Sequence, residues 1–263
     1  MLALPQAAFF LLLEVAAGGS LALFWVHLRG EVPLGFTRFT GVCLLVCGAL
    51  AIWLRASFAP TDLSPAAAVW LQVERILTIA FVVVFAAYLI LPPARIIGPL
   101  VPLLGLASLW AAALVVPSSQ LGGLGVPLAV LAGGVALGSA VTGLSLGHWY
   151  LVSPTLSVQP LIRLTFVCLG AVIAQLVLLP LLLFGPGADS GGVEQLLGDD
   201  GLFLGVRIIF GLLVPLVAVL MTWRTARIRS LDSATGLLYI VAALILSGEI
   251  AARTLFFLTG VAT

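Results

Sequence analysis

Long apolar runs separated by short polar breaks dominate the pattern of this chain. A helix needs roughly 20 apolar residues to cross a hydrocarbon core about 30 Å thick, and eight runs reach that length. Because the runs are continuous rather than alternating, they predict helices and not the strands of a barrel. The predicted spans are 7–28, 36–57, 66–91, 95–116, 126–152, 161–185, 202–222 and 235–259.

Arginines orient the predicted bundle. If the helices alternate in direction, the loops near 29–35, 92–95, 153–160 and 223–234 share one side, and most arginines lie there. Arginine-rich loops face the cytoplasm, so we expect both termini outside a bacterial-type cytoplasmic membrane. No basic residue precedes the first run, which we therefore expect to be retained as a span. The arginines expected on the cytoplasmic side are Arg29, Arg38, Arg95, Arg163, Arg224, Arg227 and Arg229.

Composition supports a membrane protein and narrows its function. Of the 263 residues, 62% are hydrophobic and 8% are charged, whereas a soluble domain carries roughly 25% charged residues. This excludes a soluble enzyme and a nucleic-acid-binding protein, and it makes the lipid bilayer the expected surroundings. No nucleotide-binding or hydrolase motif occurs either.

Two parts of the sequence also resemble each other. His27 and His148 are 121 residues apart, and a proline follows each of them six residues later. The sequence RFTGVCL at 38–44 matches RLTFVCL at 163–169 in five of seven positions. We therefore predict an all-α integral membrane protein built of two tandem four-helix repeats, at 1–120 and 121–263. An even number of helices per repeat gives both the same orientation, with a pseudo-twofold axis along the membrane normal.

His27 and His148 are the only histidines, and the repeat puts both at the cytoplasmic ends of equivalent helices. Two imidazoles from facing helices are the axial ligands that a b-type haem iron requires. Arg38 and Arg163, at the start of the following helices, are candidates to pair with haem propionates. A quinone-binding or proton-handling role near the histidines is an equal alternative.

A purely structural role is also open for these residues, which we call the cytoplasmic group: His27, His148, Arg38, Arg163, Trp149 and Tyr150. Trp149 and Tyr150 follow His148 directly, as expected of an aromatic belt at a membrane surface. Arg38 and Arg163 would then extend their side chains to lipid headgroups.

A second group of ionisable residues lies within the spans on the opposite side. Three acids and three arginines balance there, which is typical of a buried ion-pair network. Glu249 and Arg253 are four positions apart, which is the spacing of an intrahelical ion pair. A carboxyl group at this depth could instead exchange protons with a quinol. This outer layer comprises Glu14, Glu74, Arg75, Arg207, Glu249 and Arg253.

The predicted architecture resembles the NrfD/PsrC-like quinol-binding membrane subunits of respiratory oxidoreductases. The stretch ATGLLY at 234–239, with Gly248 and Glu249 downstream, is loosely similar to that family. The resemblance implies quinone binding, usually without haem, and partner subunits outside the membrane.

Three functions follow as hypotheses. The first is a membrane subunit of an electron-transfer complex that interacts with quinone or carries one haem b between His27 and His148. The second is a small-solute or ion transporter with its site at the repeat interface. The third is a scaffold subunit without a cofactor.

Overall fold

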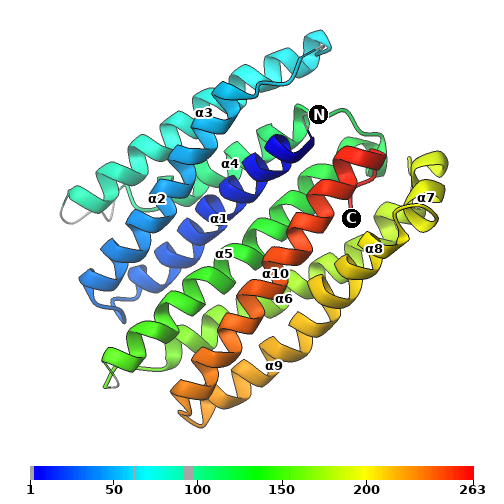
Figure 1. Cartoon of the computed structure of the whole chain (residues 1–263). Helices are drawn as coiled ribbons and strands as arrows, with labels where there is room; N and C mark the ends of the chain where they lie inside the picture. The colour runs from blue at the N-terminus through cyan, green and yellow to red at the C-terminus, as the bar shows by residue number, and fades with distance from the viewer. Residues whose placement is uncertain (1–2, 62, 92–96, 154) are drawn as a thin grey trace.

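All regular structure in the described part of the chain is helical (Figure 1). The structure is a computed structural model, and it describes residues 3–61, 63–91, 97–153 and 155–263. Arg95, used above to orient the chain, lies outside these residues. The helices are α1 (Ala3–Leu28), α2 (Leu34–Ser57), α3 (Pro65–Ile90), α4 (Leu100–Leu114), η1 (Gln120–Gly123), α5 (Gly125–Val152), α6 (Gln159–Phe184), α7 (Ser190–Leu197), α8 (Gly201–Ile208), the π-helix η2 (Ile209–Leu213), α9 (Val214–Arg227) and α10 (Leu231–Thr259).

Local chemistry accounts for several helix boundaries. Ser64 caps α3 by accepting a hydrogen bond from the backbone N–H of Ala67 at 3.2 Å, and Pro65 occupies the first turn, where no N–H is needed. Helix α10 ends at Gly260, whose positive φ of 72° closes the last turn.

Seven helical segments in the described ranges are long and apolar enough to cross a membrane. They correspond to seven of the eight predicted spans. The span predicted at 202–222 is continuous but changes from α8 through η2 to α9. In the described part of the span predicted at 95–116, the structure has the 15-residue helix α4, which starts after Pro99 and ends before Pro117. Eight membrane crossings therefore stay a prediction.

Helices α1 and α5 form the centre of the bundle and run in the same direction (Figure 1). Gly18 of α1 lies between Gly134 and Gly138 of α5, so closely that a Cβ on Gly18 would come within 1.8 Å of the Gly134 carbonyl oxygen. Small residues spaced by four allow such contact between helix backbones. One turn further on, Thr142 donates a hydrogen bond to the Gly19 carbonyl at 3.4 Å.

The other helices surround this central pair. Helix α1 packs against α2, α4 and α10, while α5 packs against α6, α10 and α4. Helices α2 and α3 lie at one edge of the bundle, and α8 and α9 lie at the opposite edge (Figure 1). The outer surfaces of these helices expose large apolar side chains. Such a surface is suited to lipid rather than water, and examples are Trp53, Ile76, Val83 and Val217.

Candidate functional site

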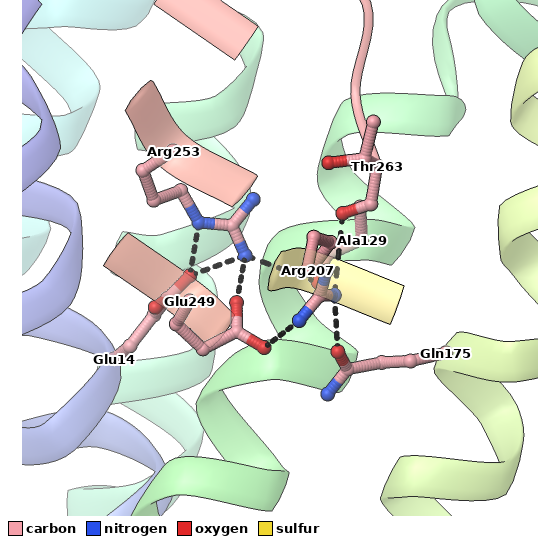
Figure 2. A network of polar contacts seen from close by, with 7 residues as sticks. All are labelled: Glu14, Ala129, Gln175, Arg207, Glu249, Arg253 and Thr263. Carbon is pink, nitrogen blue, oxygen red and sulfur yellow. Dashed lines mark hydrogen bonds and ion pairs between the residues drawn. The ribbon is translucent and has the colours of Figure 1, made fainter. Parts of the chain in front are cut away.

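The structure divides the outer-layer residues into two groups. The central cluster, drawn in Figure 2, consists of Glu14, Arg207, Glu249 and Arg253. Glu74 instead pairs with Arg55, and Arg75 lies beside them. We call Arg55, Glu74 and Arg75 the α2–α3 cluster.

Arg253 connects the two acids of the central cluster. Its Nη2 lies 2.7 Å from Oε1 of Glu14 on α1 and 2.9 Å from Oε2 of Glu249, one turn earlier on α10. Arg207 of α8 approaches Glu249 from the other side, with Nη1 donating to Oε1 at 3.1 Å. All four side chains are at most 2% exposed. Two guanidiniums therefore neutralise two carboxylates inside the bundle.

Further acceptors satisfy other donors of the central cluster. Nη2 of Arg207 donates to Oε1 of Gln175 on α6 and to the Thr263 backbone oxygen at 3.2 Å. Nη2 of Arg253 also donates to the Ala129 carbonyl of α5 at 3.4 Å (Figure 2). At Gly133 a Cβ would lie 2.5 Å from a Glu249 oxygen. This close packing leaves little room for a ligand and favours the structural interpretation of the cluster.

In the α2–α3 cluster, Arg55 is held on several sides. Its Nε lies 2.9 Å from Oε2 of Glu74, and its Nη1 donates to Oε1 of Gln6 at 2.6 Å. The flat face of the guanidinium lies 3.6 Å from the ring centre of Phe9. Thr78 donates to the Glu74 backbone and lies 3.2 Å from Oε1 of its carboxylate. Arg55 is 4% exposed and Glu74 is 1% exposed.

A cavity of about 380 Å³ adjoins the α2–α3 cluster. Nη2 of Arg55 is buried and has no hydrogen-bond partner among the described residues. Arg75 is half-buried, and it forms no ion pair with any residue that the structure describes. Nε of Arg207 in the central cluster also lacks a partner among the described residues, but the α2–α3 cluster combines such a donor with an open cavity. The cavity is lined by Ile52, Arg55, Ala56, Glu74, Arg75, Thr78 and Ile79.

The two histidines have different surroundings. The His27 ring lies edge-on to Tyr88 of α3, with centroids 5.7 Å apart, and its Nδ1 is 3.2 Å from the Thr37 hydroxyl of α2. His148, near the end of α5, is exposed. None of these observations supports a haem held between the two rings. The haem hypothesis stays a prediction.

The other residues of the cytoplasmic group link α5 and α6 to neighbouring segments. Nη1 of Arg163 donates to Glu31 of the α1–α2 connection at 2.5 Å. Trp149 contacts the edge of Phe36, and the Tyr150 hydroxyl donates to the Ser157 carbonyl at 2.5 Å. Arg38 is exposed. These contacts are compatible with a structural role near the membrane surface.

Several residues that form hydrogen bonds or ion pairs with these site residues were not predicted from the sequence. Gln175 is an amide within an apolar span, and such a residue commonly faces a polar partner, so its position was a usable signal. Glu31 and Gln6 carry no comparable signal, because each lies near the end of a span. Arg55 was not included in the predicted outer layer because it lies near the end of a span, whereas the structure buries it against Glu74.

Comparisons with protein-family models, with curated proteins and with solved structures found no match for this chain. The functional assignment therefore depends on the chemistry of the two clusters and of the cavity.

Proposed function

We propose that this protein is the quinone-binding membrane subunit of an electron-transfer complex, with the quinone headgroup bound in the α2–α3 cavity. The observation that carries the proposal is the juxtaposition, within an apolar bundle, of an open cavity with Arg55, Glu74 and Arg75. Small-molecule sites are typically pockets of roughly 300–1,000 Å³ with apolar walls and a few polar groups. The volume and lining of this cavity agree with that description.

The polar groups that line the cavity suit both the oxidised form of the ligand, a quinone, and its reduced form, a quinol. A quinone presents carbonyl oxygens, and the unused Nη2 of Arg55 and the guanidinium of Arg75 are donors for them. Ile52 and Ile79 supply apolar surface for the ring. The ring can enter from lipid because Ile79 is exposed on the outside of α3.

Glu74 is the proton-exchanging group in this proposal. Oxidation of a quinol releases two protons and two electrons. A carboxylate next to a quinol hydroxyl can accept the first proton and pass it to water, and it can then accept the second. The electrons then pass to a redox centre of a partner subunit. A partner is needed because the segments outside the long helices are short and include no separate folded unit among the described residues.

The proposal includes the expected architecture, eight crossings arranged as two four-helix repeats. Its support is the similar packing in the two halves. Helix α1 contacts α2 and α4 as α5 contacts α6 and α10, and α2 contacts α3 as α6 contacts α9. The parallel contact of α1 with α5 is the one expected beside a twofold axis along the membrane normal.

A cavity-filling pair of variants tests the function. Ile79→Trp places a large ring at the cavity, whereas Ile76→Trp puts the same ring at an exposed position of α3 that does not line it. In titration calorimetry with a short-chain quinone in nanodiscs, we expect Ile79→Trp to weaken binding at least about tenfold, or about 1.4 kcal/mol. Ile76→Trp should bind like the unmodified protein.

Two results would contradict the proposal: no quinone binding by the unmodified protein, or equal binding by both variants. Solute uptake into proteoliposomes without a redox partner would instead support the transporter hypothesis.

A further inference from the structure

The charges that line the α2–α3 cavity are not balanced. Arg55 and Arg75 contribute two positive charges, and Glu74 contributes one negative charge. The central cluster provides the comparison within the same bundle, because there two arginines meet two acids. An uncompensated cation inside a membrane is costly and usually finds a partner.

Both clusters contain a buried arginine nitrogen without an acceptor, and in the α2–α3 cluster this arginine lines a cavity. In the central cluster, Gln175 and main-chain oxygens accept hydrogen bonds from the arginines, and Nε of Arg207 has no partner among the described residues. In the α2–α3 cluster, Nη2 of the almost fully buried Arg55 lacks an acceptor among the described residues. A buried donor without a partner costs roughly 1–3 kcal/mol, and more when it is charged. The cavity therefore needs an acceptor with negative charge.

From this juxtaposition of an excess guanidinium, a buried donor without an acceptor and an open cavity, we infer that the bound molecule carries an anionic oxygen. This inference rests on the proposed function and narrows its ligand. A neutral quinone offers only carbonyl acceptors, while a hydroxyquinone whose ring hydroxyl is ionised offers a full negative charge. The phosphate of an anionic lipid offers the same chemistry from a second source. Hydrogen bonds between charged partners are about twice as strong as neutral ones.

The experiment compares two quinones that differ in one group. A short-chain alkyl naphthoquinone and its ring-hydroxylated analogue, which is ionised at neutral pH, are titrated calorimetrically into the protein in nanodiscs of zwitterionic lipid. We expect the ionised analogue to bind at least about tenfold more tightly, the effect of one charge-assisted contact.

Variants assign this preference to the cavity. Arg75→Gln removes the excess charge, and we expect it to abolish the preference while the neutral quinone still binds. Arg75→Lys keeps the charge and should keep the preference. Arg224→Gln removes an exposed arginine outside the cavity and should change nothing.

The outcomes separate this inference from the proposed function. Equal affinity of the unmodified protein for both quinones would overturn the inference and leave the function standing. Absence of binding by both quinones would overturn both. With the preference established, displacement of the ionised quinone by phosphatidylglycerol identifies lipid phosphate as a second source of the anion, and failure to displace it leaves the quinone as the only source.

Discussion

At the scale of single residues, Arg253 has the largest structural role. Its guanidinium joins Glu14 of α1 to Glu249 of α10 and also reaches a carbonyl of α5. No water surrounds this group, because its side chain is 1% exposed. Removing the cation would leave two buried acids with only Arg207 to compensate them.

We predict that Arg253→Met destabilises the protein by roughly 3–5 kcal/mol, the usual result of removing one partner from a buried ion pair. Thermal and denaturant unfolding in detergent would measure the loss. The matched control is Arg38→Met, which truncates an exposed arginine and should change stability by no more than about 0.5 kcal/mol. Equal stabilities of the two variants would disprove the structural role of the central cluster.

At the scale of helices, the contact of α1 with α5 depends on the absence of side chains. A Cβ on Gly138 would lie 2.1 Å from the carbonyl carbon of Gly18 and from the nitrogen of Gly19. Both are backbone atoms, which cannot rotate away as a side chain could. Any substitution must therefore push the two central helices apart.

The second prediction compares two glycines in long helices. Gly138→Ala should destabilise the protein by at least about 1–3 kcal/mol, because the core becomes overpacked. Gly170→Ala on α6 meets nothing within 4 Å and should be neutral or stabilising by up to about 1 kcal/mol, because alanine is the better helix former. Unfolding in detergent measures both, and a stable Gly138→Ala variant would contradict the close packing of α1 on α5.

At the scale of the whole molecule, orientation and the number of crossings can be tested together. Arg29 and Ser233 lie six predicted spans apart, with α4 among them, and both are exposed. If α4 crosses the membrane, the two positions share a side. If α4 does not cross, they lie on opposite sides.

We predict that cysteines at Arg29 and Ser233 react with a membrane-impermeant maleimide only after the cells are permeabilised. A cysteine at the exposed Ser190 should react in intact cells, because the acidic loop is expected outside. Reaction of all three in intact cells, or of only one of the first pair, would overturn the topology. The background is a variant in which alanine replaces Cys43, Cys47 and Cys168.

The sequence alone was sufficient to predict the helical class, the positions of the long apolar helices and the spacing of Glu249 with Arg253. These properties are local, since helix length depends on consecutive apolar residues and an i,i+4 pair depends only on the helical repeat. Even here, the prolines around α4 made one span shorter than its apolar run suggested.

Tertiary structure decided which ionisable residues meet. The sequence predicted a single layer of three acids and three arginines. In the structure, the rotation and register of the helices pair Glu14 with Arg253 and Glu74 with Arg55. Contacts between helices, such as that of Gly18 with Gly138, involve residues more than 100 positions apart and have no local signal in the sequence. Likewise, only the packed bundle distinguishes the enclosed central cluster from the open cavity beside Arg75, because a cavity exists between helices and has no sequence pattern of its own.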